Sequence, residues 1–489
     1  MLSDTSPSDG PTTVKFPHRS RRGVLLGLSA PQLIVVSITG LLLLAVLLTA
    51  GVTGALKLIP LWTVILAAVF IRHHGRSLAD WAPIAARFAL RRFRDQLIWL
   101  ARPSTRPRRE GLLHLPGTAA SLCVVSAPRG GFGAVHDPHH GTLTAVVKVS
   151  SRAFALLDPA AQTNNVAGWG RTLAALARTG HIARVQVLER TVPDSGDGLN
   201  RYWQEHGNAQ TRLAGPIYGD LLAAAGPAAA PHEAYVALAL NLKAARRLIN
   251  QAGGGLTGSF AVLGQLTSTF DQAARNSGLT PGNWLGASEI AAVIRTAYDP
   301  AASAALDQWS SSDRAQADPA AAGPVVLIEK ADRIQTDSAH HATFWIENWP
   351  RIETSPGFLH QLLFTSGVRR TLSLTYEPKE LDSALKDVQR RKATVIADAA
   401  ERQRKGQVDS EEDSVEYADI KQRERQLIAG HADIALTGLL TVSADSDEQL
   451  NAACAAIETA AVAALVDLRL LTWQQAEAFT NAALPLARP

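Results

Sequence analysis

The stretch Pro31–Ala50 reads PQLIVVSITGLLLLAVLLTA and contains no charged residue. At 1.5 Å of rise per residue, about 20 helical residues span roughly 30 Å, which is the thickness of the hydrocarbon core of a bilayer. This stretch therefore predicts a transmembrane helix, and it makes a membrane-anchored protein the leading interpretation of the chain.

A second apolar run follows the short link GVTGA and reads LKLIPLWTVILAAVFI from Leu56 to Ile71. Lys57 can extend its amine to the membrane surface, and Pro60 is tolerated in a first helical turn. We expect a transmembrane hairpin over residues 31–72, with spans at about 31–50 and 55–71. One span followed by a re-entrant segment is the alternative.

Basic residues flank the hairpin on both sides and are almost missing from its turn. They are Lys15, Arg19, Arg21 and Arg22 before the first span and Arg72 and Arg76 after the second, with only Lys57 between. The positive-inside rule then places both ends of the hairpin in the cytoplasm. We expect a multi-pass protein of the cell membrane whose N-terminus and large C-terminal region are cytoplasmic. A cleaved signal peptide is disfavoured, because no small-residue cleavage site precedes a mature domain.

The segments on either side of the hairpin are expected to be a tail and a surface helix. Residues 1–30 are rich in Ser, Pro, Thr, Asp and Gly, which predicts a disordered basic tail. Residues 73–110 predict an amphipathic basic helix and a linker, with a capping-box-like start at Ser77 and Asp80. This helix suits the cytoplasmic membrane interface and its lipids, and the residues assigned to the interface are Trp81, Arg87, Arg91, Arg92, Arg94 and Trp99. A helix docked on the soluble region is the alternative.

The rest of the chain alternates short β-rich runs with helical segments, which predicts an α/β or α+β region of mixed sheets. We expect a first domain over residues 111–320 and a second over residues 321–489, separated by an acidic, Ala-rich stretch. Residues 378–428 are dense in both charges and predict a helical hairpin that projects into solvent. Residues 431–465 predict a strand, a Ser/Asp cap and a helix, which is one half of a βαβ-type unit.

Charge is divided unevenly along the chain. Residues 1–110 hold 15 Lys or Arg and 5 Asp or Glu, a net +10, whereas the remainder holds 33 and 39, a net −6. Direct nucleic-acid binding by the large region is therefore not expected. The two cysteines, Cys123 and Cys454, are far apart in the sequence, which excludes a disulfide framework and fits a reducing compartment.

The motifs of nucleotide chemistry are missing from the sequence. The phosphate-binding pattern GxxxxGK[ST] does not occur, and neither does the dipeptide Gly-Lys. The run GGGLTGS at Gly253–Ser259 follows a helical segment and lacks lysine, so it predicts a helix-terminating loop. The run VVLIEKADR at Val325–Arg333 resembles a Walker B strand, in which Glu329 or Asp332 would face a metal. Without a phosphate loop, we interpret it as a buried strand that ends in a charged turn.

One cluster of histidines has the composition of a metal site. The loop VHDPHHG places His136, Asp137, His139 and His140 between two expected strands. Asp-Pro and Gly also make an ordinary hairpin turn, which is the preferred interpretation, and no metal or other cofactor is expected. Signatures such as HExxH and GxSxG do not occur in the sequence, so no catalytic residue is assigned and enzymatic activity is not expected.

The order of these parts resembles two families of conjugation proteins. The hairpin with GRSLADWAPIAARFALRRFRDQLIWL is similar to the small PrgI-like membrane proteins of Gram-positive conjugation systems, and the residues that fit their pattern are Gly75, Leu78, Trp81, Phe88 and Trp99. The remainder resembles the N-terminal, non-motor half of the CagE/TrbE/VirB ATPases of type IV secretion. That likeness rests on WIENWPRIETSPGFLHQLLFTSGVRRTLSLTYEP, the charged hairpin, GHADIALTGLLTVSADSDEQL and the ending LTWQQAEAFTNAALPLARP.

The fusion of these two pieces resembles a membrane protein family of actinobacterial integrative and conjugative elements. In the ATPases, a stretch comparable to Gln-x-x-x-Phe…Leu-Pro-Leu stands just before the motor domain. Because this chain stops at Pro489, the resemblance implies a separate P-loop motor ATPase, hexameric, that docks on this protein together with other channel proteins. It implies a non-enzymatic membrane scaffold of a conjugative DNA-transfer or type IV secretion-like apparatus. The alternatives are a core membrane component of type VII secretion, and a membrane-bound hydrolase or metal enzyme that uses the histidine loop.

Overall fold

The structure is a computed structural model that describes residues 16, 30–73, 76–101, 110–128, 131–151, 154–192, 203, 205–207, 214–225, 231–303, 305–306, 318–350, 352–379, 381–404, 411–428 and 432–489. The chain forms two compact units. The larger contains Trp99–Leu471 and Gln475–Pro489, and the smaller contains Pro17–Ile98 and Thr472–Gln474.

Two apolar helices make up much of the smaller unit. Helix α1 (Ala30–Lys57) is broken at Gly51, whose φ of 65° lies in the left-handed region that glycine adopts at little cost. Helix α2 (Ile59–Phe70) carries Pro60 in its first turn, as expected. The side-chain amide of Gln32 donates to the carbonyl oxygen of Val69 at 2.8 Å. The chain therefore doubles back between these residues, and Gly51 lies midway along it.

Among the described helices, one is long and apolar enough to cross a membrane. It covers Gln32–Lys57, with a mean hydropathy of 2.7. The second span, expected at about residues 55–71, is shorter in the structure. Helix α2 has 12 residues and reaches about 18 Å, which is less than the hydrocarbon thickness of a bilayer. After the break at Gly51, the rest of the expected link GVTGA is helical, since α1 continues to Lys57.

The smaller unit continues into an amphipathic helix. A short antiparallel pair, β1 (Arg72–His73) and β2 (Arg76–Ser77), precedes α3 (Leu78–Phe93). The capping box expected here is confirmed: the hydroxyl of Ser77 accepts from the backbone N–H of Asp80 at 3.2 Å, and the Asp80 carboxylate accepts from the N–H of Ser77 at 3.3 Å.

The larger unit is built on one thirteen-stranded sheet. Its strand order is β3-β10-β11-β12-β14-β13-β7-β8-β6-β5-β4, with β15 also paired with β12 and β9 also paired with β6. Every strand pair with a described register is antiparallel. Among these described pairs the sheet is antiparallel, where mixed sheets were expected, because each helical crossover passes over one strand and leaves its two parallel strands without direct contact.

The first half of the sheet is assembled from consecutive elements. They are β4 (Cys123–Ser126), β5 (Gly133–Asp137), β6 (Thr142–Ser151), α4 (Pro159–Arg178), β7 (Ile182–Thr191), α6 (Ala214–Ala225), β8 (His232–Asn241), α7 (Arg246–Gln251), α8 (Gly255–Arg275), β9 (Leu279–Trp284) and α9 (Ala287–Tyr298). Helix α4 starts at an N-cap, Asp158, whose carboxylate accepts from the N–H of Ala161 at 2.7 Å.

The second half repeats the same order. Its elements are β10 (Val326–Glu329), β11 (Ile334–Gln335), β12 (His340–Asn348), α11 (His360–Leu363), β13 (Arg369–Pro378), α12 (Leu381–Arg404), α13 (Glu411–Ile428), β14 (Ile434–Ala444), α14 (Asp447–Ala463), β15 (Asp467–Leu470) and α15 (Gln475–Ala483). At the outer edge, β3 (Ile98–Leu100) adds to β10. Each half is thus a hairpin, strand, helix, strand, helical insertion, strand, helix, strand and final helix, and the larger unit is internally duplicated.

Each half contains one ferredoxin-like motif. The four strands of its βαββαβ segment lie in the order β9-β6-β8-β7 in the first half and β15-β12-β14-β13 in the second. The copies meet at β7 and β13, which pair from Tyr376 with Val185 to Thr371 with Arg190. The two domains expected over residues 111–320 and 321–489 are therefore the two repeats of a single sheet.

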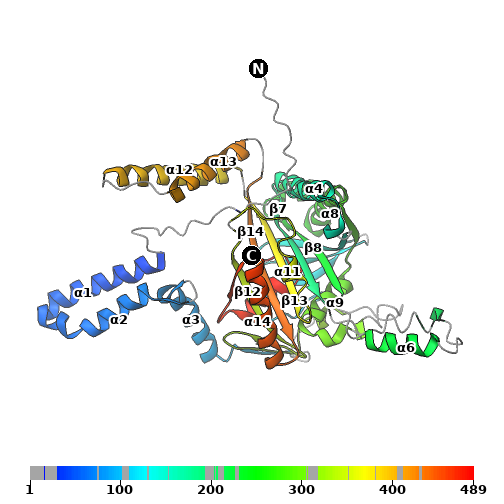
Figure 1. Ribbon diagram of the computed structural model, residues 1–489, viewed down its shortest axis with the longest axis horizontal. Helices are drawn as coiled ribbons and strands as arrows, with labels where there is room; N and C mark the ends of the chain where they lie inside the picture. The colour runs from blue at the N-terminus through cyan, green and yellow to red at the C-terminus, as the bar shows by residue number, and fades with distance from the viewer. Residues whose placement is uncertain are drawn as a thin grey trace, which may run out of the picture. The chain divides into compact units, whose positions relative to one another are not determined.

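Helices cover both faces of this sheet. On one face, α4 and α8 pack on the first repeat and α11 and α14 pack on the second. On the other face, α9 and α15 share a core with side chains such as Val146, Tyr235 and Phe479. Figure 1 shows the adjacent strands β12, β14, β13, β7 and β8 running through the middle of this unit.

A helical insertion joins the second and third strands of the βαββαβ segment in each repeat, β7 to β8 and β13 to β14. In the first repeat it contains α6, and in the second it is the pair α12 and α13. Helices α12 and α13 pack along an apolar seam that includes Ala384, Val388 and Leu427, and Lys392 pairs with Glu424 at 2.8 Å. The helical hairpin expected over residues 378–428 is thus confirmed, and Figure 1 shows it projecting from the sheet.

Candidate functional site

The second repeat carries a buried polar layer on the sheet face that α15 covers. The hydroxyls of Thr343 and Thr441 lie 3.0 Å apart across β12 and β14. His341 contacts the hydroxyl of Thr336 through Nε2 at 2.9 Å and the hydroxyl of Ser443 through Nδ1 at 2.8 Å. Because successive strand residues point to opposite faces, these polar groups alternate with the apolar side chains of the other core. Apart from Ser443, which is half-buried, the members of this layer are buried, and the layer is hydrogen-bonded internally.

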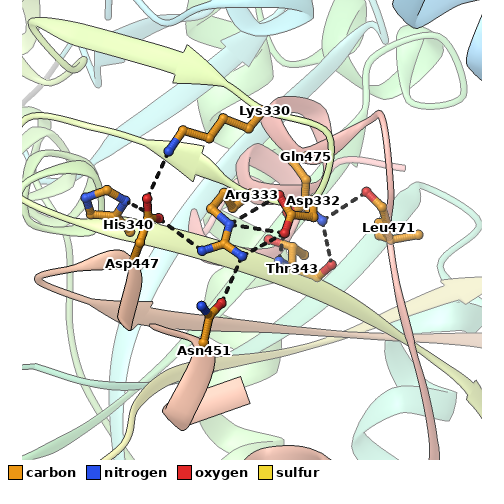
Figure 2. A network of polar contacts seen from close by, with 9 residues as sticks. All are labelled: Lys330, Asp332, Arg333, His340, Thr343, Asp447, Asn451, Leu471 and Gln475. Carbon is orange, nitrogen blue, oxygen red and sulfur yellow. Dashed lines mark hydrogen bonds and ion pairs between the residues drawn. The ribbon is translucent and has the colours of Figure 1, made fainter. Parts of the chain in front are cut away.

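A buried amide fixes the start of α15 on this layer. The side-chain oxygen of Gln475 accepts from the N–H of Thr343 at 2.8 Å, and its nitrogen donates to the carbonyls of Thr343 at 3.1 Å and Leu471 at 2.9 Å (Figure 2). The carboxylate of Glu329 accepts from the N–H of Ala476 at 3.1 Å. These bonds give partners to backbone groups at the N-terminus of α15 that would otherwise lack hydrogen bonds.

A second buried amide lies at the junction of the repeats. Gln186 of β7 donates to the hydroxyl of Ser373 on β13 at 2.8 Å and to the carbonyl of Leu484 at 3.1 Å. Its oxygen accepts from the N–H of Ala487 at 2.7 Å. One side chain therefore holds together β7, β13 and the segment that follows α15.

The C-terminal segment ends in a buried ion pair. Arg488 Nε lies 3.0 Å from Asp137 Oδ2, and both side chains are 4% exposed. Asp137 also accepts from the backbone N–H groups of His139 at 3.0 Å and His140 at 3.2 Å. Burial alone raises the pKa of Asp137, but hydrogen bonds from His140 and the charge of Arg488 outweigh it and lower this pKa.

The histidine loop is the turn between β5 and β6, organised around Asp137. The ring of His140 contacts Asp137 at 2.8 Å, whereas Nδ1 of His136 lies 3.9 Å from the sulfur of Cys123 on β4. Within the described ranges, no group of three or more His, Cys, Asp or Glu side chains is placed to hold a metal. Asp137, the strongest ligand in this loop, is engaged by Arg488.

A partly exposed charge network lies over the start of α14 (Figure 2). The carboxylate of Asp447 forms ion pairs with Lys330 at 3.0 Å and Arg333 at 3.0 Å, and it lies 2.9 Å from Nδ1 of His340. Hydrogen bonds from Lys330 and Arg333 lower the pKa of Asp447 to about 2. The network ties the turn after β10 to β12 and α14, and it holds Asp447 ionised at neutral pH.

The Walker-B-like run adopts the structure of a strand and a charged turn, as interpreted from the sequence. Glu329 is buried and bonds to α15. Asp332 pairs with its neighbour Arg333 at 2.7 Å, and this hydrogen bond is the main reason why the pKa of Asp332 is lowered. Both carboxylates therefore have structural partners.

One further expectation needs correction. Helix α8 begins at Gly255, so the run Gly253–Ser259 ends α7 and also starts α8, where glycines 253 to 255 all have positive φ. Of the residues assigned to the membrane interface, Trp81 is 5% exposed and packs edge-on against Trp473 of the same unit, and Trp99 lies in β3 against the sheet core. Trp81 is therefore buried within its own unit, whereas Trp99 is partly buried.

The basic residues assigned to the membrane interface keep positions that suit it. Arg87, Arg91, Arg92 and Arg94 lie on or next to α3, and Arg87, Arg92 and Arg94 are exposed. Phe93 and Leu90 are exposed near them. This end of α3 therefore presents mixed apolar and cationic surface, the pattern of an interfacial helix.

The residues that sequence reasoning missed are polar residues inside strands or at the chain end. Gln186, Gln475 and Arg488 carry the contacts that dock the C-terminal segment. A signal for one of them was present: Gln186 interrupts the apolar run of β7, and a polar residue in a buried strand needs a partner. The partners of Gln186 cannot be identified from the sequence, because they are Ser373, Leu484 and Ala487, which lie far from it along the chain.

The fold and these contacts define an α+β protein with an internally duplicated ferredoxin-like sheet and an apolar helix near its N-terminus that is long enough to span a membrane. No protein-family model matches the chain, and no curated protein matches it in sequence.

Proposed function

We propose that this protein is a non-enzymatic membrane scaffold of a conjugative DNA-transfer or type IV secretion-like apparatus, which anchors and orients a separate motor ATPase. The observation that carries the proposal is the combination, in one chain, of an apolar helical hairpin with a duplicated sheet in which the buried carboxylates of Asp137 and Glu329 make structural contacts. Such a chain offers a membrane anchor and a rigid body that a partner can dock on.

The anchor is a two-span hairpin in this proposal. Gly51 divides the apolar chain into legs of residues 30–50 and 52–70, and the second leg reaches about 28 Å if helix continues through the bend at Leu58. Exposed side chains occur on both legs, including Leu48, Val52 and Val64. Lipid would cover this surface, and the positive flanks favour cytoplasmic ends.

The rigid body has projecting elements suited to a partner. Helix α12 exposes Ile396 and Arg390 away from its seam with α13. The motif that resembles the stretch before the motor of the ATPases is folded onto the sheet, with Gln475 and Phe479 of α15 buried. We place the docking surface for the motor on the α12–α13 hairpin, because it projects from the sheet and exposes an aliphatic side chain, Ile396 (Figure 1).

A pull-down tests the partner. The tagged full-length protein is purified in mild detergent from its native host after crosslinking, and co-purifying proteins are identified by mass spectrometry. We expect a P-loop ATPase and other conjugation-type membrane proteins. Recovery of type VII core proteins would replace the proposal with that alternative, and absence of any ATPase would refute the motor-anchor role.

A matched pair of substitutions locates the docking surface. Ile396→Asp changes an exposed aliphatic residue on α12, and Val462→Asp makes the same change on α14. We expect the first to reduce ATPase recovery severalfold and the second to leave it unchanged. Equal loss in both variants would rule out the hairpin as the docking site.

The non-enzymatic claim has its own measurement. Purified protein should hydrolyse ATP no faster than a preparation from cells that lack it. Hydrolysis above that baseline that follows the protein through successive purification steps would refute the claim, while leaving the membrane anchor in place.

A further inference from the structure

An aromatic side chain that precedes the apolar hairpin contacts the second repeat. Phe16 stacks on Trp349, with ring centroids 5.0 Å apart and ring planes at 18°, and it meets Phe358 edge-on at 5.5 Å. The rings of Trp349 and Phe358 lie 6.4 Å apart, also edge-on. Aromatic pairs favour these separations and arrangements, because the negative face of one ring attracts the positive edge of another. The three rings therefore form one cluster, to which the N-terminal segment contributes one member.

The second repeat holds the other two rings in place without the tail. Trp349 follows β12 and packs at the margin of the core that α11 and α14 cover. Its indole lies over Gly438 of β14, where an added Cβ would come within 2.8 Å of Cζ2, so the glycine makes room for the ring. Phe358 lies in the turn before α11, where its N–H donates to the carbonyl of Ser355 at 3.1 Å. We call Trp349 and Phe358 the aromatic site.

The N-terminal region offers this site a single aromatic side chain. Phe16 is the only Phe, Trp or Tyr in residues 1–61. With Phe16 in contact, all three rings of the cluster are half-buried. The aromatic site therefore has one aromatic candidate ahead of the hairpin, and that residue occupies it.

This contact changes how the two compact units follow one another along the chain. Phe16 belongs to the larger unit, Pro17–Ile98 belong to the smaller one, and the larger unit resumes at Trp99. The chain thus leaves the larger unit, forms the apolar hairpin and α3, and returns. The hairpin is an excursion from the larger unit, and Phe16 marks the point of departure.

An excursion of this kind restricts how the hairpin can cross a membrane. The larger unit has irregular loops, whose backbone groups cannot be exposed to lipid, so it lies on one side of a bilayer. A segment that starts and ends in such a unit crosses the bilayer an even number of times. One span followed by a re-entrant segment, the alternative that the sequence left open, would separate Phe16 from Trp349 by the bilayer.

We propose that Trp349 and Phe358 form a docking site for the N-terminal tail, which Phe16 enters, and that this contact holds both ends of the hairpin on the side of the membrane where the larger unit lies. The statement about the membrane rests on the proposed anchor, whereas the docking of Phe16 does not. No second molecule is needed to fill the site, because the covalent link keeps the tail at a high effective concentration.

Photocrosslinking tests the docking. Phe16 is replaced in the full-length protein by the photoreactive aromatic amino acid p-benzoylphenylalanine, native membranes are irradiated, and crosslinked peptides are identified by mass spectrometry. We expect crosslinks within one chain to the segment from Trp349 to Phe358. Crosslinks that join two copies would show that the site takes the tail of another chain, and crosslinks that miss this segment would refute the docking site.

Matched variants show whether the rings themselves hold the tail. Phe358→Ala should lower the crosslink yield about threefold or more, because one ring contact is lost. Phe364→Ala is the control, since Phe364 is also aromatic and half exposed, but its ring contacts His232 and His360. Equal yields in these two variants would contradict the proposal. Gly438→Ala should also lower the yield, because it displaces the indole without removing a ring, and the crosslink map of the parent protein decides even if a variant does not fold.

Cysteine labelling tests the membrane part separately. Ser3→Cys in the tail and Thr459→Cys, at an exposed position of α14, are introduced one at a time after Cys123 and Cys454 have been replaced by alanine. Both should react with a membrane-impermeant maleimide from the same side of sealed vesicles, and reaction from opposite sides would overturn the proposal. If alkaline carbonate released the protein from membranes while the crosslink persisted, the membrane anchor would fail and the docking site would stand.

Discussion

The two repeats share one topology but stabilise it differently on the face covered by α9 and α15. In the first repeat this face is mainly apolar, with Val146, Leu188 and Ala237 in the core that α9 and α15 share, and Gln186 is a buried polar exception. In the second it is polar, with Thr343, Thr441 and His341 buried beneath α15. The apolar face gains stability from area removed from water, whereas the polar face is stable only while every group keeps its partner.

This difference shows what the C-terminal segment contributes. Gln475, Gln186 and Arg488 bind the segment by directional contacts to both repeats. An apolar interface tolerates small shifts, but buried amides and an ion pair accept one arrangement. We infer that the polar layer sets the register in which the segment docks.

The largest expected effect comes from the buried ion pair. Arg488→Met leaves Asp137 charged, buried and without its cation, which should lower the free energy of unfolding by about 3–5 kcal/mol. Urea unfolding of the purified protein measures this loss. The double variant Asp137→Leu with Arg488→Met should recover much of it, and a double variant as unstable as the single one would contradict the ion-pair explanation.

The buried His341 should make the stability of the polar face in the second repeat depend on pH. Burial, with the charges of Arg369 and His340, lowers the pKa of His341 to about 3. Above pH 6.5, the usual pKa of histidine, the ring of His341 is neutral in both the folded and the unfolded state. Below pH 6.5 this ring takes up a proton in the unfolded chain but stays neutral in the folded protein. Stability should therefore fall from pH 6.5 toward pH 3, by on the order of 3 kcal/mol. Difference curves against His341→Gln isolate this contribution, and identical pH profiles would disprove it.

The hydroxyl pair of the polar layer gives a double-mutant test. Thr343→Val leaves Thr441 without its partner and should cost about 1–2 kcal/mol. Changing both threonines to valine should cost less than the two single changes together, because no buried hydroxyl is then left unpaired. Additive losses, measured by urea unfolding, would show that the pair is not coupled.

The smallest effect is expected at the exposed network on α14. The pKa of Asp447 is lowered to about 2, so its pairing stabilises the folded state above the unfolded pKa near 3.8 and is lost as pH falls toward 2. Because the carboxylate is 41% exposed, Asp447→Asn should cost less than about 1 kcal/mol at neutral pH. If Asp447→Asn lowered the free energy of unfolding as much as Arg488→Met does, the exposed network would stabilise the fold as strongly as the buried ion pair, which would contradict this prediction.

Local structure followed closely from sequence patterns. The capping box expected at Ser77 and the helical hairpin expected over residues 378–428 are both present. These features depend on neighbours within one or two turns, so sequence contains their causes. The paired sheet halves were missed because the repeats match in topology while their loops and helices differ in length.

The sequence by itself determined an apolar N-terminal helix, the alternation of strands and helices, and the charged hairpin, since each rests on composition or on short-range periodicity. Tertiary structure alone decided that β7 and β13 join two repeats into one sheet and that Asp137 binds Arg488 instead of forming a metal loop with its neighbours. The reason is physical: pairing between distant strands and the partners of buried polar groups depend on which residues meet in space, and no local pattern encodes that meeting.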